Sequence, residues 1–199
     1  MGVHQRSLFG TGRLGLDPDA PCERIALDTV SWVDVRRTWV RGTDDLLDQL
    51  LPAVEWRQGR RRMYDRVLDD PRLSCWYPAG TAVPHPFLAE VGTALGAAYG
   101  VEVGTLGLNY YRDGDDSVAF HADRELRDLD DTIIAIVTFG ARRPFLIRPK
   151  GGGRSLDVAP AGGDLLVMGG ACQKGFEHGV PKVKRAGPRV SATWRWARR

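Results

Sequence analysis

Hydrophobic positions between residues 43 and 100 repeat with helical spacing in two separate segments. The first segment follows Thr43, which can cap a helix, and its apolar side chains recur every three or four residues: Leu46, Leu47, Leu50, Leu51 and Val54. Pro52 should bend or end this helix. The second segment begins at Pro86, a favourable first helical residue, and stops at Gly100. We expect the two helices to back a sheet.

From Val101 onward the pattern changes to short apolar segments separated by glycine, proline and aspartate. Seven segments have the length and composition of strands: 101–111, 118–123, 132–139, 144–148, 155–158, 164–168 and 188–196. Short strands after a pair of helices are typical of an α+β protein whose second half is an antiparallel sandwich. We therefore predict a double-stranded β-helix, or jelly roll, over about residues 101–199, backed by the N-terminal helices. Residues 1–24 show no sustained period and are expected to form an extension on this domain.

The composition is that of one soluble globular domain. Of the 199 residues, 43% are hydrophobic and 27% are charged, and a chain of this length can bury a full core. The longest apolar run, 132–139, is far too short to span a membrane, and we expect no signal segment. Three cysteines without CxxC spacing favour buried, reduced thiols over disulfides or a zinc site. We expect a cytoplasmic monomer with no membrane partner.

The basic residues are mostly arginine, whose planar guanidinium suits phosphates and carboxylates. The net charge is only +3, yet 24 of the 28 basic residues are arginines, and five of them lie between residues 57 and 66. Such a cluster is as often a solvated surface as a binding site. Aspartate-rich segments near 113–116 and 128–131 balance the total, so any nucleic-acid footprint must be local.

Two histidines and one aspartate are the strongest candidates for a metal site. His121 and Asp123 form an H-x-D pair on a strand-like segment, where alternate side chains point to the same face. His178 lies just before the last predicted strand, where a later strand of a jelly roll can return beside an earlier one. Two histidines with one carboxylate form the facial triad that holds ferrous iron and leaves positions open for oxygen and a co-substrate. Zinc with the same ligands and a water is the competing interpretation.

The last predicted strand carries polar side chains on one face and apolar side chains on the other. The polar positions are Arg189, Ser191, Thr193 and Arg195. Two arginines on the buried side of a strand are costly unless each meets an anion, and a dicarboxylate offers one carboxylate to each. This spacing is common by chance, and six residues of strand span roughly 20 Å, so the geometry permits such a ligand without requiring it.

These residues follow one another along the chain in the order N-x-Y, H-x-D-x-E, H and R-x5-R. They stand in the segments NYYRDGDDSVAFHADRE, DLLVMGGACQKGFEHGVPK and PRVSATWR. With the upstream segment DDPRLSCWY, this order closely resembles the AlkB family of iron- and 2-oxoglutarate-dependent dioxygenases, over about Met63 to Trp196. The resemblance implies use of Fe(II), 2-oxoglutarate and O2 to demethylate N-alkylated bases, such as 1-methyladenine and 3-methylcytosine, in DNA or RNA. Formaldehyde, succinate and CO2 would be released.

The resemblance also implies roles for individual residues of a cofactor site. His121, Asp123 and His178 match the iron ligands. Arg195 would pair with the 2-oxoglutarate carboxylate that chelates the metal, and Arg189 with the distal carboxylate. Further polar side chains are expected to contact the co-substrate: Asn109, Tyr111 and Thr193.

For the substrate, the resemblance implies a base flipped out of its stack and held between aromatic or apolar side chains. Glu125 matches an acidic residue near the target base, where an acceptor suits an exocyclic amino group. Trp76 and Tyr77 are candidates for the pocket wall, within a nucleotide-recognition lid over about residues 56–85. The arginines expected to grip phosphates are Arg60, Arg61, Arg62, Arg143 and Arg148. A residue that wedges a duplex open has no clear match, and the candidates are Val83, His85 and Phe87.

Two other interpretations stay open. The same oxygenase chemistry could act on a protein side chain or a small metabolite. Alternatively, the chain is a non-catalytic jelly-roll module that binds nucleic acid through its basic patch. The sequence does not decide between DNA and RNA, or between single and double strands.

Overall fold

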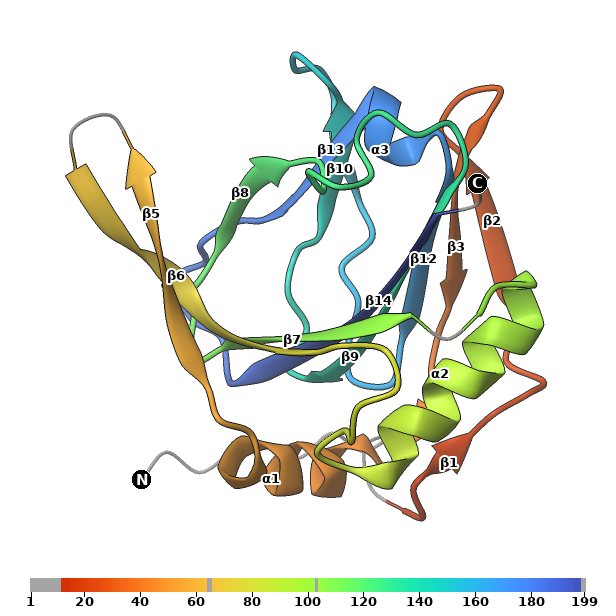
Figure 1. Ribbon diagram of the computed structural model, residues 1–199, viewed down its shortest axis with the longest axis vertical. Coiled ribbons are helices and arrows are strands. Elements are labelled where there is room, and N and C mark those ends of the chain that lie inside the picture. The colour runs from red at the N-terminus through yellow and green to blue at the C-terminus, as the bar shows by residue number, and fades with distance from the viewer. Residues whose placement is uncertain (1–11, 64–65, 103, 198–199) are drawn as a thin grey trace.

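Two antiparallel β-sheets form the body of the protein, which a computed structural model describes over residues 12–63, 66–102 and 104–197 (Figure 1). The major sheet has the strand order β2 (Cys22–Ala26), β3 (Ser31–Arg36), β12 (Leu165–Gly170), β9 (Thr132–Gly140), β14 (Arg189–Ala197), β7 (Thr105–Tyr111), β6 (Arg66–Tyr77) and β5 (Arg57–Met63). The minor sheet has the order β11 (Leu156–Asp157), β10 (Leu146–Pro149), β13 (Phe176–Val180) and β8 (Val118–His121). A short ladder pairs β1 (Gly15–Leu16) with β4 (Val40–Arg41).

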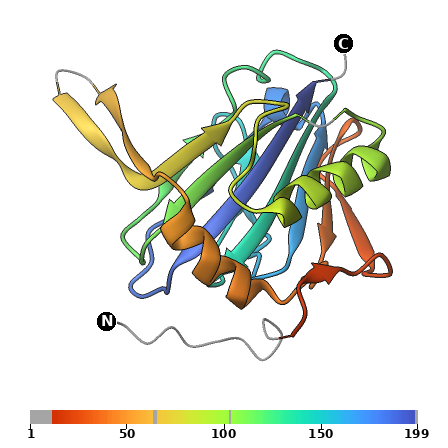
Figure 2. The same ribbon diagram turned by 60° about the horizontal axis from the view of Figure 1, so that its bottom comes forward.

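Two helices, α1 (Thr43–Ala53) and α2 (Pro86–Tyr99), cover one face of the major sheet, as Figures 1 and 2 show. The end of α2 is as predicted, because Gly100 adopts the left-handed backbone, with φ 63°. The start of α1 differs by one residue: Gly42 is the cap, with φ 68°, and Thr43 is a buried first helical residue. A short third helix, α3 (Cys172–Gly175), follows β12. Within the described ranges, no helix has the length and hydrophobicity needed to cross a membrane.

Apolar side chains form two layers, one on each face of the major sheet. The first layer lies between this sheet and helices α1 and α2, and the second lies between the two sheets. Strand β9 is apolar along most of its length because both of its faces are covered. Its Ile133 and Ala135 join the first layer, whereas Ile134 and Ile136 join the second. The polar face of β14 therefore points into the space between the sheets.

The structure is mostly β, so the α+β prediction is right about the helices but underestimates the sheet. Strands β2 and β3 occupy part of the segment before residue 43, and residues 1–11 of the expected extension lie outside the described residues. Strands β5 and β6 form a hairpin within the expected lid, and Figure 1 shows it projecting from the major sheet. Strand β13 was not predicted, because its sequence FEHGV mixes polar and apolar residues without alternation. Two facing antiparallel sheets are consistent with a jelly roll.

The three wedge candidates all have structural contacts. His85 caps α2, where its Nδ1 accepts a hydrogen bond from the Phe87 N–H at 3.2 Å. Phe87 is buried, and Val83 packs against the same core layer. The burial of Phe87 contradicts a wedge role for that residue, whereas Val83 and His85 are half-buried and their role stays a prediction.

Candidate metal centre

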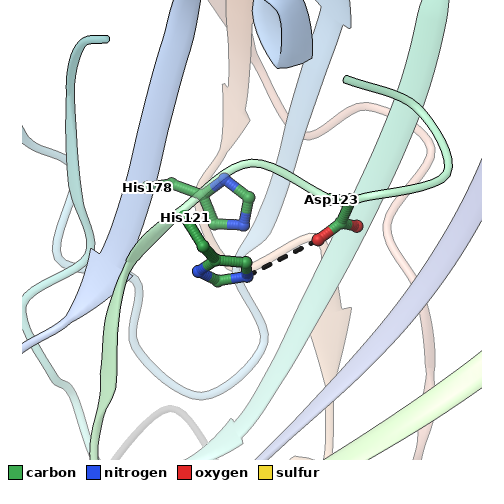
Figure 3. A group of neighbouring side chains, drawn as sticks. All are labelled: His121, Asp123 and His178. Atoms are coloured by element: carbon green, nitrogen blue, oxygen red, sulfur yellow. Dashed lines mark ion pairs between the residues drawn. The ribbon is translucent and has the colours of Figure 1, made fainter. Parts of the chain in front are cut away.

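His121, Asp123 and His178 meet between the two sheets, as the metal-site hypothesis required (Figure 3). Their ligand atoms all lie within 4.8 Å of one another, and the centroids of the two imidazole rings are 4.4 Å apart. The minor sheet causes this meeting, because His121 of β8 pairs directly with His178 of β13 in the ladder. Asp123 lies two residues beyond the end of β8, with Oδ1 3.5 Å from Nε2 of His121. The aspartate is thus in a loop, not on the strand that was predicted to carry it.

The protonation states of these groups suit a divalent cation. Burial would raise the pKa of Asp123, but the hydrogen bond from His121 and the positive charge of Arg195 outweigh it and lower that pKa. Burial, with the nearby His121, lowers the pKa of His178 to about 3, so this imidazole is neutral at pH 7. A neutral imidazole and an ionised carboxylate are the forms that bind metals, and this mixed nitrogen and oxygen set fits ferrous iron.

A cavity of about 650 Å³ surrounds the three ligands. Its walls include two residues of the polar face of β14 that were expected to contact the co-substrate, Thr193 and Arg195. Asn109 and Tyr111 of β7 also line it, and Glu125 lies on its rim as an exposed side chain. The cavity therefore brings most of the expected cofactor residues to the metal ligands.

Arg189 is completely buried just beyond this cavity, behind the Tyr111 ring, whose centre is 5.5 Å from its Cζ. Its Nη2 donates to Oγ1 of Thr138 at 3.3 Å, but its Nε and Nη1 have no hydrogen-bond partner among the residues that the structure describes. Burial lowers the pKa of Arg189 to about 10. A buried guanidinium with two unpaired donors is unfavourable unless an anion reaches it, which fits a carboxylate ligand.

Arg195, at the other end of the polar face of β14, already has an anionic partner. Its Nε donates to Oδ2 of Asp123 at 2.5 Å, and within the described part of the chain its buried Nη1 has no hydrogen-bond partner. The guanidinium also lies against the indole of Trp76, with Cζ 4.7 Å from the ring centroid. Arg195 thus connects the metal ligand Asp123 to the wall of the cavity.

Trp76 and Tyr77 point to opposite faces of β6, because neighbouring side chains on a strand alternate. Trp76 lines the cavity and is 51% exposed, whereas Tyr77 packs against the helix-side core layer. The indole lies across Gly107, where a Cβ would come within 2.7 Å of it. Tyr77 therefore cannot form the pocket wall expected of it.

Arg143 does not fit the phosphate contact expected of it. Its side chain is buried, and its guanidinium donates to four backbone carbonyl oxygens, those of Asp113, Gly114, Asp116 and Pro181. These bonds hold the loop after β7 against the segment after β13. Arg143 is a structural residue of the minor-sheet side.

The other arginines expected to contact phosphates are paired with acidic residues where the structure describes their side chains. Arg60 pairs with Asp69, and Arg148 pairs with Glu177 while it lies over the Phe120 ring. The side chains of Arg61 and Arg62 lie outside the described residues.

Two residues that sequence reasoning did not assign contact the expected site residues. Arg72 of β6 donates through Nε to Oδ1 of Asn109 at 3.0 Å and lines the cavity. Alternation with Trp76 along β6 could have identified Arg72. Gln173 of α3 accepts the backbone N–H of Asp123 at 2.9 Å, and no sequence signal marked it.

Comparison with known proteins identifies the family. The family model described as 2OG-Fe(II) oxygenase superfamily matches residues 48–195. The chain belongs to this superfamily. The "Alpha-ketoglutarate-dependent dioxygenase alkB homolog 3" of Homo sapiens is 32% identical over 215 residues, which cover 98% of this chain and 70% of the relative. The "DNA oxidative demethylase ALKBH2" of Homo sapiens is 32% identical over 176 residues, 76% of this chain and 67% of the relative.

Two solved structures share the fold. OsALKBH1 has a TM-score of 0.60 at 14% identity, covering 87% of this chain and 99% of that chain. A Pseudomonas putida prolyl-4-hydroxylase has a TM-score of 0.57 at 18% identity, covering 84% and 92%. As a 2OG-Fe(II) dioxygenase the protein uses iron and 2-oxoglutarate, and its residues fit both groups. The triad offers the metal ligands, and the unpaired donors of Arg189 and Arg195 suit two carboxylates.

Proposed function

We propose that this oxygenase demethylates N-alkylated bases, such as 1-methyladenine and 3-methylcytosine, in DNA or RNA. The observation that carries the proposal is the half-exposed indole of Trp76, an aromatic plane at the cavity that contains the metal triad. A base removed from its stack needs such a plane to replace the lost stacking. Relatives at about 30% identity that are named as a DNA oxidative demethylase support the same substrate class.

In this proposal the guanidinium groups of the two arginines of β14, rather than their backbones, would hold the two ends of 2-oxoglutarate. Arg195 would bind one carboxylate through the buried Nη1, and Arg189 would bind the other, which would compensate its buried charge. Tyr111 lies between Arg189 and the cavity and shares that carboxylate. Asn109 accepts from Arg72 through Oδ1, which leaves its amide N–H groups to donate. Thr193 offers its hydroxyl from the middle of the strand.

The substrate base lies between Trp76 and the metal ligands, with Glu125 at the rim as an acceptor for an exocyclic amino group. When bound, iron and 2-oxoglutarate supply the O2-dependent oxidation that releases formaldehyde, succinate and CO2. The protein residues orient the base and the co-substrate and exclude water from the site. We assign the lid role to the projecting β5–β6 hairpin, because its strand β6 supplies Arg72 and Trp76 to the wall of the cavity.

Formaldehyde release tests this proposal directly. Oligonucleotides with 1-methyladenine or 3-methylcytosine, as DNA or RNA and as single or double strands, are incubated with iron and 2-oxoglutarate. We expect formaldehyde from at least one of them. If none is turned over while succinate still forms, the nucleobase substrate is wrong and the oxygenase assignment stands.

The variant Trp76→Ala tests the stacking plane. Because base stacking on an aromatic side chain contributes about 1–3 kcal/mol, we expect the KM for the oligonucleotide to rise by roughly 5- to 100-fold. Tyr77→Phe is the matched control, since Tyr77 faces the opposite side of β6 and should leave this KM unchanged. An equal KM in both variants would remove Trp76 from the substrate site.

A further inference from the structure

The three metal ligands are not held equally by the β-sheet. His121 and His178 lie opposite each other in paired strands, so the ladder fixes both backbones. Asp123 follows the end of β8, which is the edge strand of the minor sheet, and has no partner in the ladder. Its position in the loop must therefore come from other contacts.

Asp123 has contacts at its carboxylate and at its backbone. Arg195 donates to the carboxylate, which also lies 3.5 Å from Nε2 of His121. In the backbone, the carbonyl oxygen accepts the N–H of Leu126 from the same loop at 3.0 Å, and the N–H donates to Oε1 of Gln173 at 2.9 Å. The carboxylate contacts would change with a metal or co-substrate bound, because both would interact with Asp123 or Arg195. The contact with Gln173 comes from outside the loop and does not involve any group that the metal or the co-substrate would use.

The burial of the Gln173 side chain is unfavourable by itself. This side chain is 1% exposed, and the one hydrogen-bond acceptor of its amide nitrogen among the described residues is the weakly accepting Sδ of Met168, at 4.0 Å. Burying an amide with one strong hydrogen bond is unfavourable compared with an apolar side chain of the same size. The hydrogen bond to Asp123 is the contact that accounts for an amide at this position.

We propose that Gln173 is a positioning residue for the iron site, which fixes the Asp123 backbone so that its carboxylate faces His121 and His178. The short helix α3 carries Gln173 to this place directly after β12 of the major sheet. Gln173 thus ties the loop of the minor sheet to the more extensively paired sheet behind it. Residues that orient metal ligands typically contribute 10- to 100-fold to metal affinity.

Titration of the metal-free protein with Co(II), without oxygen or substrate, tests the proposal. Gln173→Met keeps the length of the side chain and removes the acceptor, so we expect Co(II) affinity to fall by roughly 10- to 100-fold. Cys172→Ala is the matched control, because Cys172 is buried on the same helix and packs in the apolar layer between the sheets. Cys172→Ala should lower the melting temperature and leave Co(II) binding unchanged, whereas Gln173→Met should weaken Co(II) binding whatever its melting temperature. Unchanged binding in Gln173→Met, or equal losses in both variants, would overturn the proposal.

Amide hydrogen exchange decides the matter even if Gln173→Met does not fold. In the unmodified metal-free protein, the amide of Asp123 should exchange more slowly than those of the exposed loop residues Arg127 and Asp128. Equal exchange rates would show that the hydrogen bond between the Asp123 N–H and Gln173 does not form and would overturn the proposal. The proposal for Gln173 rests on the iron site alone. Its failure would leave the proposed nucleobase substrate unaffected, and failure of the nucleobase proposal would leave the role of Gln173 unaffected.

Discussion

The two ends of the polar face of β14 are built in opposite ways. At the distal end, Arg189 is fully buried, and among residues 12–63, 66–102 and 104–197 two of its donors are unpaired and the Thr138 hydroxyl is its hydrogen-bond partner. At the metal end, Arg195 is paired with Asp123 and lies against the Trp76 indole. The distal end holds a charge that the protein does not neutralise, whereas the metal end neutralises its own.

This difference indicates what each end requires from a ligand. A buried unpaired guanidinium destabilises the metal-free protein, and an incoming carboxylate removes that penalty. At the metal end, a ligand must instead share Arg195 with Asp123. Binding of 2-oxoglutarate should therefore draw most of its affinity from Arg189, and metal binding should depend on Arg195.

Arg189→Met gives the largest expected effect. Loss of one partner of a buried charge pair costs about 3–5 kcal/mol, so we expect 2-oxoglutarate to bind roughly 100-fold more weakly or worse. The melting temperature of the metal-free protein should rise, because an unpaired buried charge is replaced by an apolar side chain. Calorimetric titration with 2-oxoglutarate and Mn(II), without oxygen, and thermal unfolding measure the two effects.

Arg143→Met is the control for this result. Arg143 is equally buried, but its guanidinium donates to four carbonyl oxygens. Its removal should lower the melting temperature, since those acceptors lose their donor. If the melting temperature of Arg189→Met falls as much as that of Arg143→Met, the buried Arg189 charge does not destabilise the metal-free protein.

The next effect is a pH dependence confined to the metal end. Burial lowers the pKa of His178 from 6.5 to about 3, so the unfolded chain binds this proton between pH 6.5 and 3 and the folded protein does not. The free energy of unfolding of the metal-free protein should therefore fall by up to a few kcal/mol as the pH decreases through that window. Asp123 adds a loss only at lower pH, because its pKa lies below its ordinary value of 3.8.

Denaturant unfolding at several pH values, with a chelator present, measures this dependence. His178→Asn should flatten the curve, and Arg189→Met should leave its slope unchanged. A wild-type curve that stays flat between pH 6.5 and 4 would contradict the burial of a neutral imidazole.

The sequence predicted the faces of β14 correctly because alternation is a local property of a strand. It could not predict that His121 pairs with His178, since strand pairing is decided by tertiary contacts, and β13 itself has no clear pattern. The same limit applies to arginine. Arg143 and Arg148 look alike in the sequence, and only their burial shows that the first holds loops together while the second lies at the surface.

Unrecognised strands caused the errors near the substrate side. Trp76 and Tyr77 are adjacent, so a strand places only one of them at the cavity, and the recognition of β6 would have separated them. The role of Gln173 depends on a contact between segments far apart in the chain, which no local pattern encodes. Local periodicity therefore predicts which way side chains point, but not which segments meet.

A third prediction concerns the shared charge of Arg195. Arg195→Met removes the guanidinium that orients the Asp123 carboxylate through Oδ2, so we expect Co(II) affinity to fall by roughly 10- to 100-fold. Binding of 2-oxoglutarate should weaken as well, because Arg195 also faces the cavity. Separate calorimetric titrations, first with Co(II) and then with 2-oxoglutarate, distinguish the loss of metal affinity from the loss of co-substrate affinity. Should Arg189→Met weaken Co(II) binding as much as Arg195→Met does, the two ends are not independent.

The smallest effect is expected from Thr138→Val, which keeps the shape of the side chain and removes the one hydroxyl that Arg189 contacts. A single hydrogen bond of this kind contributes about 1 kcal/mol, so 2-oxoglutarate should bind about fivefold more weakly while Co(II) affinity is unchanged. In the double variant with Arg189→Met, Thr138→Val should have no further effect, because the hydroxyl acts only through the guanidinium. An additive loss in that double variant would mean that the Thr138 hydroxyl contacts the co-substrate directly, without Arg189 as an intermediary.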